Sequence, residues 1–212
     1  MIFFVQNLAA QKTLKKSFSS KANKIIAEFD FIDQVEIVTT DQANQIIVIS
    51  KSEEITSSNI SIEEVRNKLF IKSVGKNING SEIAVIKLTN IRPVYPSYQI
   101  RIPRNMNVDV SIVNGNFSSK DFHGNLQLKM EEGTVKIDSF KGDVLIDINI
   151  GNVNITEIED CKIDVHSNLG KISSNLELEK DNNHFYGVVG NKKNSLNINA
   201  MLANIHLKSA LN

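Results

Sequence analysis

Residues 125–142, NLQLKMEEGTVKIDSFKG, and residues 143–160, DVLIDINIGNVNITEIED, carry one pattern at the same positions, and this pattern decides the fold. Two further copies flank them, at residues 107–124 and 161–178. A fixed period of this length is typical of repeat proteins, in which each unit buries its apolar face against the next unit. One glycine recurs in every copy at a nearly constant interval: Gly115, Gly133, Gly151 and Gly170.

Apolar and polar residues alternate within each copy, as at Leu126, Leu128 and Met130. This period of two indicates a strand with one buried face. A second short alternation follows each glycine, and the units are rich in residues that favour strands and turns. A rung of about 18 residues is too short for a βαβ unit, which needs about 30. The sequence therefore predicts an all-β fold, a single-stranded parallel β-helix (a solenoid) with irregular N-terminal strands.

Equivalent residues in such a coil lie about 4.8 Å apart along its axis, so that like side chains form columns. The repeated glycines are predicted to form the corners, where a positive φ suits glycine and strains a β-branched residue. The largest apolar column is predicted to be a core ladder, and its members are Phe122, Phe140, Ile158 and Leu176.

The remaining segments follow this pattern less closely. Residues 25–29 and 35–37 resemble a degenerate rung, and residues 61–65 could form one helical turn capped by Ser61. Residues 179–183 are predicted to be a loop. A last rung follows at residues 196–207, with Ala203 in place of the glycine, and is predicted to close the end of the coil.

The N-terminal residues 1–10, MIFFVQNLAA, resemble the end of a secretory signal peptide, with an apolar stub before small residues. The alternative is an ordinary edge strand. The preferred interpretation is a truncated signal at residues 1–10 followed by one β-solenoid domain at residues 11–212, placed outside the cytoplasm.

Composition excludes several classes of function. Lys and Arg together number 24, as do Asp and Glu, and Trp is absent, so the sequence predicts no nucleic-acid partner. No run approaches about 18 uninterrupted apolar residues, so it predicts no transmembrane span. The single cysteine, Cys161, is interpreted as a small buried residue rather than a reactive thiol.

The ionisable residues indicate no catalytic, cofactor-binding or metal site. Stacking each copy on the next places Asp121 beside Ser139 and then Glu157, and no column gathers three acids. The histidines His166 and His206 could approach each other, but no further ligand pattern accompanies them. Four aromatic residues flank the coil and are interpreted as covers for its ends, with a sugar or partner platform as the alternative: Tyr95, Tyr98, Phe185 and Tyr186.

Several motifs carry a resemblance to a known family. A strand closed by proline at residues 98–103 is followed by NVDVS at 107–111 and VNGN at 113–116; EEGTVKI at 131–137 and NIGNVNI at 149–155 come next. With these motifs the chain resembles a bacterial putative adhesin family, a domain of unknown function found in exported proteins. The resemblance covers residues 12–208 and is strongest from residue 98. It implies a parallel β-helix outside the cytoplasm, with adhesion assigned by analogy and no catalytic residue.

The sequence thus favours a non-enzymatic binding or scaffold module of the bacterial envelope, either periplasmic or at the cell surface. Its expected partner is a glycan or a cell-surface protein. Two alternatives stay open at this point. One is a carbohydrate-active β-helix enzyme, a polysaccharide lyase or hydrolase, and the other is a regulatory or structural envelope component that binds a membrane partner.

Overall fold

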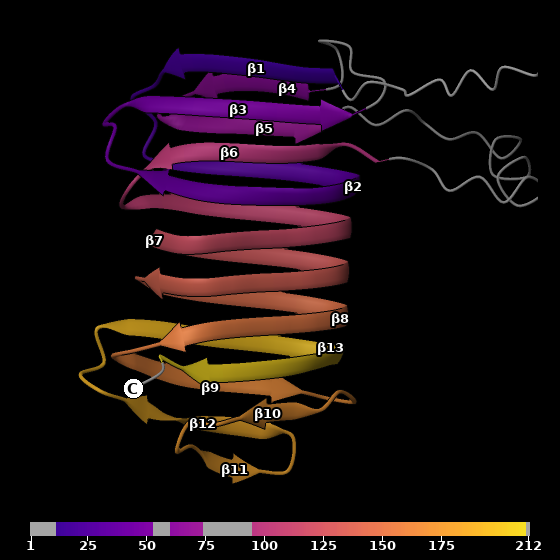
Figure 1. Ribbon diagram of the computed structural model, residues 1–212, viewed down its shortest axis with the longest axis vertical. Coiled ribbons are helices and arrows are strands. Elements are labelled where there is room, and N and C mark those ends of the chain that lie inside the picture. The colour runs from indigo at the N-terminus through magenta and orange to yellow at the C-terminus, as the bar shows by residue number, and fades with distance from the viewer. Residues whose placement is uncertain (1–11, 53–59, 74–94, 211–212) are drawn as a thin grey trace, which may run out of the picture.

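The computed structural model describes residues 12–52, 60–73 and 95–210, and this part of the chain forms strands and turns without a helix (Figure 1). The strands make one large, mostly parallel sheet that is not closed into a barrel, so the all-β prediction is confirmed. Their bounds are β1 Lys12–Ser19, β2 Lys24–Thr40, β3 Gln45–Ser52, β4 Ile60–Val65, β5 Lys68–Ser73, β6 Ser97–Pro103, β7 Met106–Lys141, β8 Asp143–Ile158, β9 Cys161–Ser167, β10 Ile172–Ser174, β11 Glu179–Asp181, β12 His184–Val189 and β13 Asn194–Ser209.

The central strands pair in parallel, one copy of the repeat against the next. Leu126 of β7 lies opposite Val144 of β8, which is the equivalent residue of the following copy. The degenerate copy takes part as well, because Ile25 of β2 lies opposite Val108 of β7. In Figure 1 the long strands bend at one edge, so that the chain winds down the longest axis of the molecule.

Alternate residues of the central strands point into one continuous core. The buried apolar side chains form a single cluster that includes residues of β2, β7, β8, β9 and β13. Each fully buried Val, Ile or Phe contributes about 1.5–3 kcal/mol relative to exposure, so this cluster is the main stabilising term. The residues of the expected core ladder are all buried: Phe122, Phe140, Ile158 and Leu176.

The corner glycines leave no room for a side chain. Gly133 has a φ of 149°, and a Cβ placed on it would lie 1.7 Å from the carbonyl oxygen of Gly115. Gly151 repeats this arrangement, at 1.8 Å from the carbonyl oxygen of Gly133. Gly170 lacks a positive φ, and a Cβ there would lie 1.9 Å from the carbonyl oxygen of Ala203. Close backbone approach, in addition to conformation, therefore requires glycine at these corners.

The strand β13 lies between β8 and β9, not at the end of the stack (Figure 1). Ala203 lies opposite Gly151 of β8, while Ala200 lies opposite Ser167 of β9. The prediction that the last rung closes the coil is therefore wrong. The hairpin β11–β12 covers β9 instead, and β12 pairs with β9 in antiparallel fashion. Its outer strand, Glu179–Asp181, is exposed and charged, which protects the edge from further pairing.

Two local predictions also differ from the structure. Residues 61–65, predicted as a helical turn, belong to β4, which pairs with β5 in antiparallel fashion. The turn between them has positive φ at Arg66 and Asn67, as two-residue hairpins require, and Ile60 is buried. Residues 179–183, predicted as a loop, begin the hairpin β11–β12.

Asp160 anchors the segment that leads into β13. Its Oδ1 accepts hydrogen bonds from the backbone and side-chain nitrogens of Asn191, at 2.9 and 3.1 Å. Its Oδ2 lies 3.0 Å from the Lys193 ammonium. The backbone hydrogen bond from Asn191 and then the Lys193 contact lower the pKa of the Asp160 carboxyl. The backbone nitrogen of Asn194 donates to the carbonyl oxygen of Asp160, so β13 begins at this anchor.

The predicted signal remnant at residues 1–10 lies outside the described residues. Among the described residues, no helix is long and apolar enough to cross a membrane.

A substitution at one corner tests the close approach. We expect Gly133→Val to lower the free energy of unfolding by at least about 3 kcal/mol, because the side chain clashes with a backbone carbonyl and strains φ. Lys129→Val introduces the same residue at an exposed position of the same strand and should change stability by less than about 1 kcal/mol. Urea unfolding followed by circular dichroism measures both. Equal midpoints would contradict this account of the corner.

A truncation tests the position of β13. Deleting residues 194–212 should leave β8 and β9 without their shared partner and remove amide-exchange protection from those amides of both strands that face β13, while β1–β3 keep theirs. Deleting only residues 210–212 is the matched control and should leave exchange unchanged. Protection of the β13-facing amides of β9 that survives the longer truncation would contradict the position of β13 between β8 and β9.

The Asp160 anchor predicts a dependence of stability on pH. Because the folded pKa is lowered, the carboxylate contributes stability above its ordinary pKa of 3.8, and this contribution is lost as the pH falls through the folded value. In Asp160→Asn this part of the acid dependence should be absent, so the melting temperatures of the two proteins should converge at low pH. Thermal unfolding from about pH 7 to about pH 2 measures the difference. A constant difference over that range would contradict the anchor's role.

Candidate functional site

One outer face at the C-terminal end of the sheet carries ring-bearing and amide side chains in two columns. On β9 and β12, His166 lies opposite His184 and Asp164 lies opposite Tyr186. On the other side of β9, two side-chain amides of β13 extend these columns: Asn197 lies opposite Asp164, and Asn199 lies opposite His166. We call this surface the His–Tyr face, and its members are Asp164, His166, His184, Tyr186, Asn197 and Asn199.

Contacts within the His–Tyr face fix its rings. Nε2 of His184 lies 2.9 Å from Oδ1 of Asp164, so the imidazole donates a hydrogen bond to the carboxylate. The ring centroids of His184 and Tyr186 are 4.8 Å apart, and those of His184 and His166 are 6.3 Å apart. Three rings and a carboxylate on two adjacent strands thus form a pre-ordered surface.

The phenol of Tyr186 also stays in its neutral form. A hydrogen bond to the Glu179 side chain, and then the negative charge of that carboxylate, raise the pKa of Tyr186. Tyr186 is 36% exposed, so part of its ring is available to solvent beside the His184 ring. The ring therefore offers an apolar face with a polar tip, the combination that suits amphipathic ligands.

Several polar groups of this face have no hydrogen-bond partner among the described residues. In the part of the chain that the structure describes, neither the ring nitrogens of His166 nor the side-chain amide of Asn197 makes a hydrogen bond. Asn199 donates through Nδ2 to Asp147 at 3.0 Å, which leaves its amide oxygen available as an acceptor. A shallow hollow of about 240 Å³ lies between this face and the nearby corner, lined by Asp147, Ile148, Asn149, His166, Asn168, Asn199, Ala200 and Met201.

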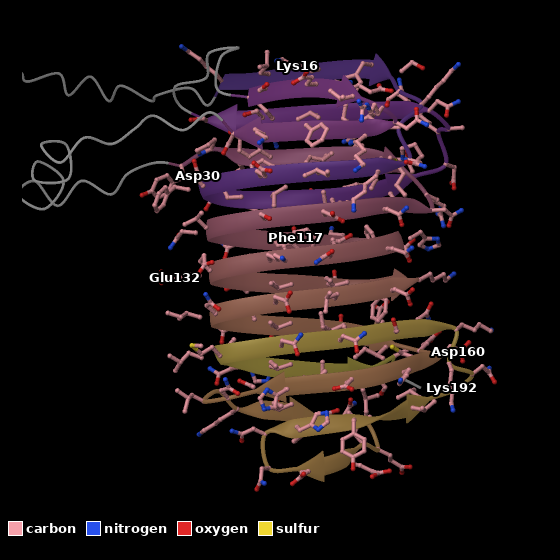
Figure 2. All side chains as sticks on the ribbon, turned by 180° about the vertical axis from the view of Figure 1, so that it is seen from behind. Lys16, Asp30, Phe117, Glu132, Asp160 and Lys192 are labelled. Atoms are coloured by element: carbon pink, nitrogen blue, oxygen red, sulfur yellow. The ribbon has the colours of Figure 1, made fainter. Side chains whose placement is uncertain are left out.

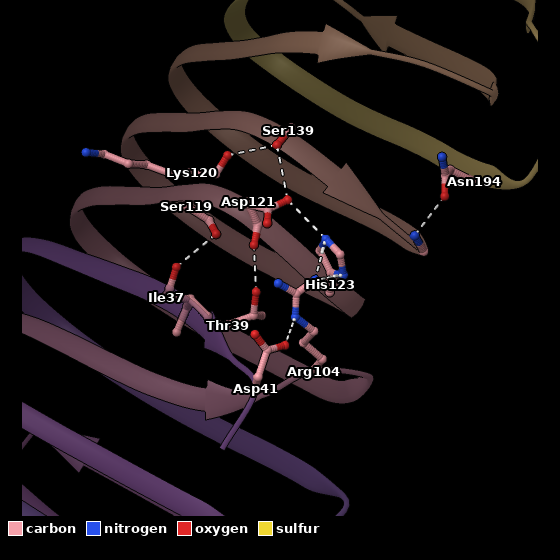
Figure 3. Close-up of polar contacts among 11 residues, drawn as sticks. Ile37, Thr39, Asp41, Arg104, Ser119, Lys120, Asp121, His123, Ser139 and Asn194 are labelled. Carbon is pink, nitrogen blue, oxygen red and sulfur yellow. Dashed lines mark hydrogen bonds and ion pairs between the residues drawn. The ribbon is translucent and has the colours of Figure 1, made fainter. Parts of the chain in front are cut away.

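A second polar cluster lies at the opposite corner, between β2, β6 and β7 (Figure 3). Nε of Arg104 lies 2.7 Å from Oδ1 of Asp41, and NH1 of Arg104 lies 2.8 Å from Nδ1 of His123. Nε2 of His123 lies 3.0 Å from Oδ1 of Asp121, which also accepts from the Ser139 hydroxyl at 3.4 Å. A neutral imidazole protonated at Nε2 satisfies all of these contacts.

The order of groups in this cluster does not suit nucleophilic catalysis. A serine nucleophile needs a base within hydrogen-bonding distance of its hydroxyl, and the base needs a carboxylate behind it. Here the Asp121 carboxylate stands between Ser139 and His123, so the imidazole does not contact the hydroxyl. The cluster ties neighbouring rungs together, since Thr39 of β2 also donates to the backbone oxygen of Asp121 at 2.6 Å.

The remaining candidate groups also lack the features of a catalytic or metal site. Burial, and then the charge of Asp143, raise the pKa of Cys161 to about 12, so the thiol is not a thiolate at neutral pH. No group of three or more His, Cys, Asp or Glu side chains is arranged to hold a metal ion within the described ranges. The larger hollow, of about 570 Å³, is lined by uncharged residues only: Ser17, Phe18, Ser19, Gln42, Ala43, Asn44 and Gln45.

The sequence located parts of these sites. Asp121 meets Ser139, as the repeat spacing predicts. Of the four aromatic residues, Tyr98 is part of the core cluster and Phe185 is buried, whereas Tyr186 is exposed. His166 meets His184 instead of His206, which lies in another column and contacts Ser173. The pairing of His166 with His184 was missed, because it depends on the antiparallel return of β12.

Comparisons with known proteins identify the fold. No family model matches the sequence, and no curated protein matches it. The structure is similar to the crystal structure of a putative cell adhesion protein from Clostridium sporogenes, with 17% identity and a TM-score of 0.64, over 95% of this chain and 100% of that chain. The resemblance to adhesins seen in the sequence is therefore confirmed at the level of the fold.

Two further solved structures are less similar. A putative adhesin from Bacteroides fragilis has 11% identity and a TM-score of 0.37, over 94% of this chain and 98% of that chain. A putative lipid binding protein from Parabacteroides distasonis has 11% identity and a TM-score of 0.29, over 93% of this chain and 96% of that chain. These TM-scores are too low to carry an argument about this chain.

Proposed function

We propose that this chain is a non-enzymatic binding module of the adhesin type, working outside the bacterial cytoplasm, in the periplasm or at the cell surface. Residues 11–212 form its single domain, a parallel β-helix with one copy of the repeat in each rung. The copy-to-copy register between β7 and β8 supports this architecture. The fold shared with the Clostridium sporogenes protein supports the assignment to adhesion.

The ligand that best suits the His–Tyr face is a glycan. A sugar ring has an apolar C–H face, which packs on an exposed aromatic ring, and a rim of hydroxyl groups, which need planar donors and acceptors. Tyr186 supplies the ring, and His166 on β9 and Asn197 on β13, which make no side-chain hydrogen bond within the described residues, can supply hydrogen bonds along the same face. The one observation that carries the proposal is this exposed aromatic ring on a face where His166 and Asn197 make no side-chain hydrogen bond within the described residues.

The shape of the surface favours an extended ligand that is bound and not cleaved. Glycoside cleavage by paired carboxylates needs two acids about 5–9.5 Å apart on either side of the bound sugar. Asp164 of the His–Tyr face is engaged by His184, and Asp147 of the adjacent strand β8 is engaged by Asn199. The nearby hollow is smaller than a typical small-molecule pocket, which agrees with recognition along an open face.

A glycan array carrying bacterial and mucosal polysaccharides tests this function. We expect binding to a subset of polysaccharides without their depolymerisation, and Tyr186→Ala should weaken it about two- to tenfold because one stacking contact is worth about 0.5–1.5 kcal/mol. Asn197→Ala should weaken binding by a smaller factor.

Tyr95→Ala is the matched control. Tyr95 lies outside the His–Tyr face and stacks on the exposed ring of Phe31, at a centroid distance of 5.9 Å. This variant should bind like the wild type. Binding that is insensitive to Tyr186, or turnover of any polysaccharide that one carboxylate substitution abolishes, would overturn the proposal.

A further inference from the structure

One corner of the molecule carries a line of exposed apolar side chains on three adjacent rungs. Leu202 of β13 lies opposite Ile150 of β8, and the backbone nitrogen of Leu169 donates to the carbonyl oxygen of Met201 at 2.8 Å. We call this line the apolar ridge, and its members are exposed by 48%, 51%, 48% and 72%: Ile150, Met201, Leu202 and Leu169.

The ridge is a change in the pattern of the corner. One rung before Ile150 the same position holds Glu132, and Asn114 donates a hydrogen bond to Glu132 at 3.2 Å. In Figure 2 Glu132 lies on the same edge as Asp30, on the side away from Asp160 and Lys192. The outward corner position is therefore polar at Asn114 and Glu132 and apolar in the last three rungs, while the first rung carries the exposed Phe31 there. A contiguous apolar surface of this kind marks an interaction site.

We propose that the apolar ridge is the contact between two copies of this chain, related by a two-fold axis perpendicular to the long axis of the molecule. When such an axis passes between the rungs of Ile150 and Leu202, Ile150 of one copy contacts Leu202 of the other, and Leu202 of the first copy contacts Ile150 of the second. Rungs are about 4.8 Å apart, so the next rung outward brings Glu132 of one copy to the rung that carries both Leu169 and Lys171 in the other.

Charge selects this arrangement among the two-fold alternatives. In the described part of the chain, Lys171 has no ion-pair partner, so its ammonium is available to a second copy. A two-fold axis parallel to the long axis would set Glu132 of one copy against Glu132 of the other, and like charges in contact are unfavourable. The perpendicular axis pairs Glu132 with Lys171 twice.

A membrane surface fits the ridge less well. Segments that lie in the membrane interface carry Trp or Phe on the apolar side and Lys or Arg around it. The ridge contains no aromatic residue, and Glu131 and Glu132 border it, which repels anionic lipid. The perpendicular dimer also has a functional consequence, because both His–Tyr faces then point to the same side and can engage one surface together.

Sedimentation equilibrium of the purified chain, from about 1 µM to about 1 mM without glycan, tests the dimer. We expect reversible dimerisation, lost in Leu202→Asp. The control is Val65→Asp, because Val65 is exposed to a similar degree on β4 and lies outside the ridge. A Val65→Asp protein that associates like the wild type, beside a monomeric Leu202→Asp protein of unchanged melting temperature, supports the proposal.

Charge exchange gives a second test that does not depend on a core-proximal substitution. Glu132→Lys and Lys171→Glu should each weaken dimerisation about tenfold, and the double variant should restore it. A monomeric wild type, or single exchanges without effect, would overturn the proposal. So would sedimentation of the monomer with phosphatidylcholine–phosphatidylglycerol vesicles in a manner lost in Leu202→Asp. Because no glycan is present, these outcomes are independent of the glycan-binding test.

Discussion

Parallel pairing of equivalent positions on neighbouring strands is the interaction on which the rest of this structure depends. A parallel pair needs its strands held at about 4.8 Å over the whole rung, including the bend. At the bend the backbones approach so closely that a Cβ on Gly133 would lie 1.7 Å from a carbonyl oxygen. Once that approach is fixed, strict alternation follows, and it decides which side chains are buried in the core and which are displayed in columns on the outside.

The parallel pairing of β7 with β8 could be predicted from the sequence, because this pairing depends on a local pattern. Period-two alternation and the regular glycines are visible in one sequence, and contacts between equivalent positions of successive copies, such as Asn149 with Glu131, follow from them. The order of the last rungs does not follow. The segment of β13 has the same alternation as its neighbours, so the pattern allows it beside any of them. The choice depends on anchors that act at a distance along the chain, above all Asp160 with residues 191–194.

The same reason limits prediction of the candidate site. Tyr186 stands out as an aromatic residue near the end of the coil, but its neighbours depend on the reversal of direction at β12. A parallel continuation would have given His184 other partners. The antiparallel pairing sets His184 beside His166 and Tyr186 beside Asp164. Contacts of this kind arise from a single irregular hairpin, which repeat periodicity does not encode.

The inserted strand connects topology to both proposed surfaces. On one face β13 sets Asn197 and Asn199 next to β9, and at the corner it sets Met201 and Leu202 between the rungs of β8 and β9. If β8 and β9 paired directly, the rings of β9 and β12 would lie beside Leu145 and Asp147 without the β13 amides, and the ridge would lose its middle rung. The insertion therefore creates surface chemistry that the consecutive order of copies would lack, which gives a physical reason for a topology that the repeat alone does not require.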